Sequence, residues 1–392
     1  MTTQPTTRPV MSRGGVRLLF LVPGAFCLLA GLDAALVLLG LPAPVDTSRL
    51  PVVHGPLLVF GFIGTVIALE RAVAVRRAWA FASPAFLGVG GILLVTPVPL
   101  VVGQCLLAAG SAVLLLIYAA IWRRQAMFAS AVQALGAWLA LASTLLWAGG
   151  LPASALVPGM TGFIVLTIAG ERIELARLVV MSRRTELTAI GVSIALGAGV
   201  LAAMLWPTIG YRVFGLCVLA YVAWLLQFDV ATRLATGSRG LPRYIAICLL
   251  AGYGWLIVAG LVWLFVGETV QGPWYDGAVH AVFLGFTMGM IMAHAPVILP
   301  AVLRRPLPYR PMLIWPVALL NLSLVVRVLV GDTQNLPVWV QVGGVIGVVA
   351  LLLFVVLTVV SALLGPPAPR KAASAGPGMA ADRNDGRRKD AR

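Results

Sequence analysis

Charged side chains are scarce in this sequence, and histidine is nearly absent. Only 10% of the 392 residues are Asp, Glu, Lys or Arg, and only His54, His280 and His294 can supply an imidazole. So few charges beside 60% apolar residues exclude a soluble globular domain of this length. The four cysteines stand singly, without a CxxC or CxxCH motif, which excludes zinc-finger spacing and covalent heme attachment.

Long apolar runs fill nearly all of the chain between Val16 and Leu364. Runs of about 18 or more apolar residues are typical of membrane spans, and lipid-exposed spans must be helical or closed barrels because lipid offers the backbone no hydrogen-bond partner. The sequence therefore predicts an all-α polytopic membrane protein with about twelve transmembrane helices. The predicted spans are 16–40, 52–75, 78–97, 98–122, 128–150, 155–180, 187–207, 211–231, 242–266, 275–298, 311–331 and 337–364.

The placement of arginine predicts how these helices are oriented. Arginines gather before the first span, in every second loop and in the tail, whereas the alternate loops hold most of the loop aspartates and glutamates. This is the positive-inside pattern of a bacterial inner-membrane protein with both termini in the cytoplasm. It predicts a cytoplasmic N-terminal segment (1–15), a transmembrane domain (16–365) and a disordered basic cytoplasmic tail (366–392). The net charge of +15 thus needs no nucleic-acid partner.

An internal repeat links every fourth predicted helix. The segment GFIGTVIALER (61–71) shares seven of eleven residues with GFIVLTIAGER (162–172). GFTMGMIMAHA (285–295) is a weaker third copy, in which His294 stands where the first two copies have glutamate. Because four helices return the chain to the same side of the membrane, the repeat predicts three pseudo-repeated four-helix units.

The histidines lie inside apolar spans, where ionisable side chains are functional candidates by default. By the helix rise, His54 and His280 lie at similar depth in the outer third of the membrane, whereas His294 lies about 21 Å deeper than His280. Two imidazoles at matched depth on different helices fit the two axial ligands of one heme iron better than a zinc or copper site. Asp33 lies in the same half of the membrane and is a candidate hydrogen-bond partner for an imidazole.

This layout resembles the catalytic subunit of heme-copper oxidases. In that family, a His followed by Gly on helix 2 ligates a low-spin heme, and VVHGPLLVFGF supplies His54 and Gly55 in this way. The second His of a His-x-His on helix 10 is the other ligand; it corresponds to His280, while Ala278 occupies the first position. Predicted helices 6 and 7 contain no His, so the resemblance implies that the copper centre that reduces oxygen is missing. Helix 10 is also similar to the NnrS family, twelve-helix heme proteins linked to nitric oxide stress.

The same resemblance directs attention to one arginine. The oxidases hold the heme propionates with an arginine pair between helices 11 and 12, but the loop GDTQNL (331–336) has no arginine. Arg327, near the outer end of predicted helix 11, is the candidate that remains. The alternative is that this side chain extends outward to the membrane surface.

A polar cluster stands at the inner ends of helices 2 and 6. Adjacent residues on a helix point in different directions, so Glu70, Arg71, Glu171 and Arg172 are expected to pair across helices, for example Glu70 with Arg172. We interpret these pairs as structural. The alternative is a proton or ion path that includes His294.

Together these patterns predict a membrane protein that holds a non-covalent heme b between His54 and His280. Such a heme would serve electron transfer, or a response to NO or redox stress, with a redox partner or subunit. Whether the protein is an enzyme stays open. The rival hypothesis is a proton- or ion-coupled secondary transporter that uses Glu70, Glu171 and His294.

Overall fold

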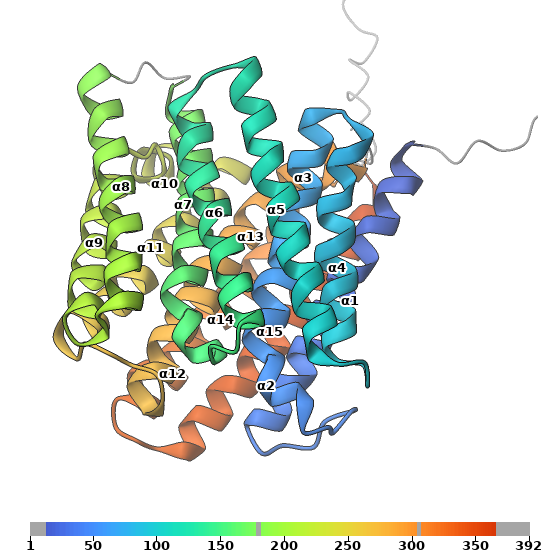
Figure 1. The fold of residues 1–392 in the computed structure, drawn as a ribbon, viewed down its shortest axis with the longest axis vertical. Helices are drawn as coiled ribbons and strands as arrows, with labels where there is room; N and C mark the ends of the chain where they lie inside the picture. Colours follow the sequence, from blue (N-terminus) through green and yellow to red (C-terminus); the bar gives the residue numbers. More distant parts are fainter. Residues whose placement is uncertain (1–12, 178–181, 304–306, 366–392) are drawn as a thin grey trace, which may run out of the picture.

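The computed structural model describes residues 13–177, 182–303 and 307–365, and within these ranges every regular element is a helix (Figure 1). Most of the predicted N-terminal segment and all of the predicted tail lie outside the described residues. The α-helices are α1 (Arg13–Leu38), α2 (Arg49–Pro56), α3 (Thr65–Val75), α4 (Ala82–Leu94), α5 (Leu100–Arg124), α6 (Phe128–Ala148), α7 (Val157–Arg177), α8 (Arg183–Leu205), α9 (Pro207–Phe228), α10 (Ala231–Gly237), α11 (Leu241–Phe265), α12 (Gly272–His280), α13 (Gly289–Leu303), α14 (Ile314–Leu324) and α15 (Pro337–Leu364).

Several of these helices join end to end through short segments of different winding. Three π-helical segments connect α2 to α3, connect α12 to α13, and extend α14; they are η1 (Leu57–Gly64), η4 (Ala281–Met288) and η6 (Val325–Asp332). Three 3₁₀ turns precede α4, α7 and α14; they are η2 (Ala78–Phe81), η3 (Ala153–Leu156) and η5 (Pro311–Leu313).

The prediction of a polytopic helical membrane protein is confirmed. Eleven helical stretches among the described residues are long and apolar enough to cross a bilayer. One further apolar stretch, Ala78–Leu94, is shorter than these. It is the predicted span 78–97, and it packs against α5, η1 and α1.

Helix starts differ most from prediction around α8 and α9, because the end of an apolar run is a poor guide to the end of a helix. α8 begins at Arg183, four residues before the predicted span, since the Ser182 hydroxyl accepts a hydrogen bond from the backbone N–H of Thr185 and caps the first turn. α9 begins at Pro207 rather than 211, with proline in the first turn where its missing N–H costs nothing.

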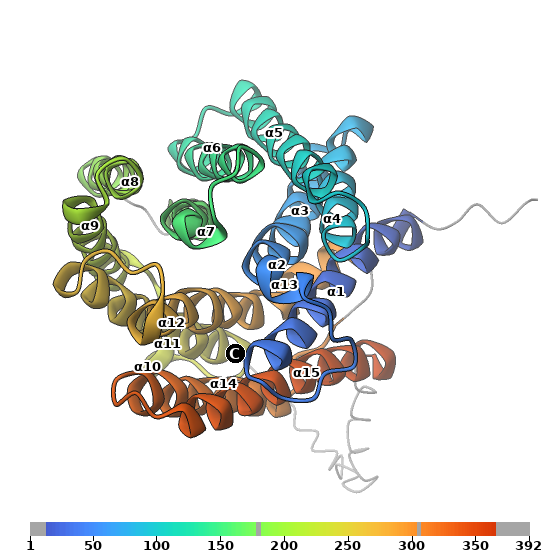
Figure 2. The same cartoon turned by 60° about the horizontal axis from the view of Figure 1, so that its bottom comes forward.

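The three spans that carry the sequence repeat form the centre of the bundle. Within the 18-residue apolar window of each span, the share of buried residues is 78% in Ala153–Glu174, 67% in Arg49–Val75 and 61% in Gly272–Val302, against at most 56% in the other long spans described. Figure 2 shows α7 on the inner side of α6 and α8, and α3 contacts α13. The Phe60 and Phe163 rings, 6.3 Å apart, join η1 to α7.

Small residues allow close approach next to this centre. A Cβ added to Gly91 on α4 would lie 2.9 Å from the Cα of Gly61 on η1, so the two backbones touch directly. Glycine is required at such a contact because any side chain would push the helices apart.

The bundle has two distinct ends. We call the end where α3 and α5 finish the basic end; there the Arg124 guanidinium donates to the backbone oxygen of Val75 at 3.0 Å. The opposite end, where α2 and α12 begin and η6 finishes, is the acidic end (lower part of Figure 1). The candidate residues divide between these two ends.

Candidate functional site

His54 lies near the end of α2 with one ring nitrogen fixed. Its Nδ1 is 3.0 Å from the carbonyl oxygen of Gly31 on α1. A carbonyl oxygen can only accept, so Nδ1 carries the proton and donates, and the lone pair of the ring lies on Nε2. Asp33 does not contact this ring; its carboxylate instead accepts from the backbone N–H of Val45 at 3.2 Å. The expectation that Asp33 would bond an imidazole is therefore wrong.

His280 has the same proton arrangement at the end of α12. Its Nδ1 is 2.8 Å from the backbone oxygen of Asp276 and 3.3 Å from the carboxylate of the same residue. Both acceptors lie one helical turn earlier, so Nδ1 donates and Nε2 keeps its lone pair. In metal sites, a carboxylate that accepts from the ring nitrogen not bound to the metal orients the imidazole and raises its basicity.

Arg327 lies on η6 and reaches the same carboxylate. Its Nε and Nη2 each donate to Asp276 at 2.9 Å, which is a bidentate pair. The arginine is only 8% exposed, so it points into the protein and does not extend to the membrane surface. Among the described residues, Nη1 of Arg327 makes no hydrogen bond, which leaves one donor for a further acceptor.

The structure brings the three predicted residues together. Asp276 contacts both His280 and Arg327, and the ring of His54 lies within electrostatic range of these three side chains at the acidic end. Asp276 was not among the predicted site residues, although its spacing of four residues before His280 is a signal for contact on a helix.

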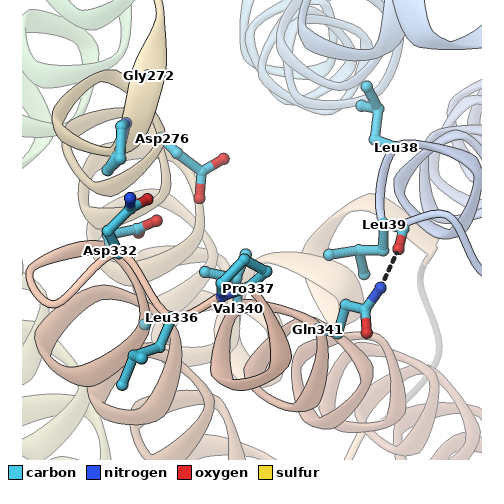
Figure 3. Close-up of a pocket in the computed structure, with 12 residues that line it drawn as sticks. Leu38, Leu39, Gly272, Asp276, Asp332, Leu336, Pro337, Val340 and Gln341 are labelled. Carbon is cyan, nitrogen blue, oxygen red and sulfur yellow. Dashed lines mark hydrogen bonds between the residues drawn. The ribbon is translucent and has the colours of Figure 1, made fainter.

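A cavity of about 300 Å³ lies at the acidic end of the bundle, and Asp276 is one of the residues that line it. Figure 3 shows Asp276 and Asp332 on one side of the cavity and Leu39 with Gln341 on the other. Asp332 is 7% exposed, and its Oδ2 is buried with no hydrogen-bond partner among the described residues. Sequence reasoning missed this carboxylate because it lies at the end of a span, where loop aspartates are ordinary.

Each of the three π-helical segments in the described ranges either contains a predicted site residue or begins within three residues of one. η1 begins three residues after His54, η4 begins immediately after His280, and η6 contains Arg327. A π turn inserts an extra residue into the helix, which rotates the side chains that follow relative to those before it. Such turns are rare and are frequently found at functional sites.

The polar cluster at the basic end is organised around Arg71. Its Nη2 contacts the carboxylate of Glu171 at 2.8 Å and that of its neighbour Glu70 at 3.3 Å, and its Nη1 lies 3.9 Å from Glu174. The predicted pair of Glu70 with Arg172 is wrong, because the reciprocal pair between these repeats forms instead. Contact between the adjacent Glu70 and Arg71 was also not expected; both long side chains bend toward Glu171.

Arg172 turns away from the repeat partner to a carboxylate that no motif indicated. Its Nε and Nη2 donate to Asp229 at 2.7 and 2.6 Å, and the Tyr253 hydroxyl donates to the same carboxylate at 2.6 Å. Burial by itself raises the pKa of Asp229, but the hydrogen bonds and charge of Arg172, with the Tyr253 bond, outweigh burial and hold the pKa below its usual value. The pair therefore stays ionised and locks α7 to the segment after α9.

A second, larger cavity of about 630 Å³ extends from the middle of the bundle to the polar cluster; we call it the central cavity. The three repeat copies line it with equivalent positions. These positions are 63, 66, 67 and 70 in the first copy, 164, 167, 168 and 171 in the second, and 287, 290, 291 and 294 in the third. Most of the remaining lining is apolar and comes from α1 and α15.

His294 is the titratable residue that the third copy presents to the central cavity. Its Nδ1 is 2.8 Å from the backbone oxygen of Met290, so Nδ1 donates and Nε2 holds the lone pair. That Nε2 is buried and has no partner among the described residues. Glu70 and Glu171 reach the same cavity, so the structure brings together the three residues of the rival transporter hypothesis.

Across the described ranges, no three His, Cys, Asp or Glu side chains gather closely enough to hold a metal ion.

The fold and these two sites define an all-helical polytopic membrane protein with buried titratable groups at both ends of its central helices. The profile of a family described as a domain of unknown function (DUF8744) matches residues 17–363, so the chain belongs to that family. No curated protein matches the sequence.

Proposed function

We propose that the protein binds a b-type heme non-covalently between His54 and His280 and uses it in electron transfer or in a response to NO or redox stress. One observation carries the proposal: both imidazoles have Nδ1 fixed by a carbonyl oxygen, so both Nε2 atoms keep a lone pair for iron, within one electrostatically coupled region. Neutral imidazole is a common axial ligand of heme iron.

The residues around the pair suit such a group. When bound, a heme with two axial imidazoles exchanges one electron at a time. The backbone oxygen of Gly31 fixes the ring of His54, and Asp276 fixes that of His280. The Nη1 group of Arg327 would hold a propionate, as the resemblance to heme-copper oxidases implies, while its other nitrogens remain paired with Asp276.

The role in NO or redox stress is supported by the resemblance to the NnrS family alone. The resemblance to the oxidases supports the bis-histidine site. It does not extend to oxygen reduction, because predicted helices 6 and 7 hold no histidine that could bind the copper ion. Electron transfer would then require a redox partner or subunit.

We also propose the finer architecture. Counting the shorter stretch Ala78–Leu94 gives twelve spans in three four-helix units, and the equivalent positions around the central cavity support this repeat. The arginine pattern supports a bacterial inner-membrane protein with the basic end and both termini in the cytoplasm.

The visible spectrum of the purified protein tests the heme. His54→Ala and His280→Ala should each abolish the reduced low-spin spectrum. His294→Ala is the matched control, because it removes an imidazole from the opposite end of the same central helices and should keep full heme content. Gel filtration confirms that each variant is folded. Full heme content in both His54→Ala and His280→Ala would overturn the proposal.

The structure gives less support to the transporter hypothesis. In the described residues, Glu171 is neutralised by Arg71, and the cavity between Glu70, Glu171 and His294 is lined mainly by apolar side chains. An ion path needs polar groups or water along its length. Protein in liposomes that drives proton-coupled solute flux, and loses it in Glu70→Gln, would favour transport instead.

A further inference from the structure

Two of the side chains that line the central cavity each have a buried polar atom without a hydrogen-bond partner among the described residues. One is Nε2 of His294 on α13, and the other is Oγ1 of Thr358 on α15. A buried polar atom left without a hydrogen bond costs about 1–3 kcal/mol, so atoms of this kind are expected to have a partner. The cavity between them holds the space for that partner.

The protonation of His294 determines what the partner must offer. Its Nδ1 already donates to the backbone oxygen of Met290, so in the neutral imidazole Nε2 is the acceptor. The occupant must therefore present an O–H or N–H donor to His294. The Thr358 hydroxyl can donate to a second oxygen of the same occupant or accept from it.

The charges around the cavity exclude an acidic head group. Two of the lining residues are glutamates, Glu70 and Glu171, and none of the described lining residues is Lys or Arg. Arg71, which contacts both glutamates, is already engaged by them. A phosphate or fatty-acid carboxylate would meet two carboxylates without a cation of its own. The occupant therefore has a neutral head with hydroxyl groups.

The remainder of the occupant must be apolar. The central cavity has a volume of about 630 Å³, within the roughly 300–1,000 Å³ range of small-molecule sites. Leucine, isoleucine, valine and methionine side chains make up most of its lining. This volume admits a six-membered ring with a short branched hydrocarbon chain, and a ring with two hydroxyls on opposite sides can reach two hydrogen-bonding groups on different helices.

We propose that the central cavity binds an isoprenoid quinol from the membrane, with one quinol hydroxyl donating to Nε2 of His294 and the second oxygen bonded to the Thr358 hydroxyl. The isoprenoid chain lies among the apolar side chains of α1, α13 and α15. This proposal concerns binding alone and does not depend on heme at the acidic end.

Equilibrium binding of a short-chain quinol, decylubiquinol, tests the site. The protein is held in lipid nanodiscs under anaerobic conditions, and empty nanodiscs give the partition background. The matched probe is the 1,4-dimethyl ether of the same quinol, which keeps the ring and chain but has no donor. The quinol should bind roughly tenfold more tightly than the ether, because the ether leaves His294 unsatisfied.

Variants then locate the site. His294→Leu should weaken quinol binding roughly tenfold and bring it level with the ether, and His294→Gln, which keeps an acceptor, should restore part of the difference. Thr358→Val should weaken quinol binding several-fold. Ile67→Trp should block binding by filling the cavity, whereas Ile194→Trp on the lipid-facing surface of α8, where Ile194 is 60% exposed, should not.

Several results would overturn the proposal. Equal binding of quinol and ether to the unmodified protein does so without any variant, even if substitutions at His294 prevent folding. Unchanged quinol affinity in folded Ile67→Trp does so as well, because it shows that the probe binds elsewhere. Repeating the measurement in His54→Ala separates this proposal from the heme, since quinol binding should persist there even when the heme spectrum is lost.

Discussion

Removing one member of the buried pair of Arg172 and Asp229 should be among the most destabilising single substitutions in the bundle. The side chains are 6% and 2% exposed, and three hydrogen bonds of 2.6–2.7 Å converge on the carboxylate, one of them from Tyr253. Removing one member of a buried pair costs about 3–5 kcal/mol, because the remaining charge stays buried without its counter-ion. Asp229→Asn should therefore destabilise the protein by about that amount.

The melting temperature of the detergent-solubilised protein measures this effect. At about 2 °C per kcal/mol, the slope for domains near 250 residues, Asp229→Asn should lower the melting temperature by about 6–10 °C. Tyr253→Phe removes one bond to a charged group and should cost about 1.5–3 kcal/mol. The double variant Arg172→Met, Asp229→Asn should be more stable than the sum of its single effects predicts, since both charges are then gone.

Two outcomes would refute this reasoning. One is a melting temperature for Asp229→Asn within about 1 °C of the unmodified protein, far below the shift expected for an unpaired buried charge. The other is strict additivity of Arg172→Met and Asp229→Asn, which would show that the two groups do not stabilise each other. A surface substitution such as Arg239→Met controls for the loss of one arginine.

Three further predictions follow from named contacts. The stabilisation from Asp229 should be present above about pH 4, the pKa of the unfolded state, and be lost as the pH falls through the lowered pKa of the folded state. The difference in melting temperature between the unmodified protein and Asp229→Asn should therefore shrink between pH 7 and pH 3, and a constant difference would contradict this. Glu171→Gln should lower the melting temperature more than Glu70→Gln, since Glu171 makes the 2.8 Å contact to the shared arginine and Glu70 a 3.3 Å one; the reverse order would count against that arrangement. Gly215→Ala should destabilise the protein by about 1–3 kcal/mol, because the added Cβ would lie 2.6 Å from the backbone of α11. Gly254→Ala has open space around its Cβ and should be neutral. Equal melting temperatures for the two variants would disprove the close packing at Gly215.

Most of the fold could be predicted from the sequence because lipid leaves few alternatives. An apolar run must become a helix in a bilayer, so the positions of spans followed from hydropathy. The first residues of α8 and α9 could not be predicted from hydropathy. Capping by Ser182 starts α8, and the proline at 207 starts α9, before the apolar run of each helix begins. The π turns could not be predicted either, because no single residue type marks them in the sequence.

The candidate site was predictable where a rare residue marks it. His54 and His280 stood out because ionisable groups are scarce in these spans, whereas Arg327 was singled out by the resemblance to the oxidases. The structure places the three at the same end of the bundle, within electrostatic range of one another. Asp276 and Asp229 escaped notice because each lies at a span end, where a carboxylate is ordinary. Which arginine pairs with which carboxylate depends on helix rotation, and a repeat motif alone does not determine that rotation.

The third repeat copy shows why position 294 holds histidine rather than glutamate. In the first two copies the glutamate is followed by an arginine, but His294 is followed by Ala295. Arg71 already serves Glu70 and Glu171, and Arg172 is committed to Asp229. A third glutamate facing the central cavity would thus be a buried charge without a counter-ion, at a cost of several kcal/mol. A neutral imidazole keeps a hydrogen-bond acceptor in the same place without that charge, and it leaves the cavity able to accept a neutral hydroxyl from a ligand.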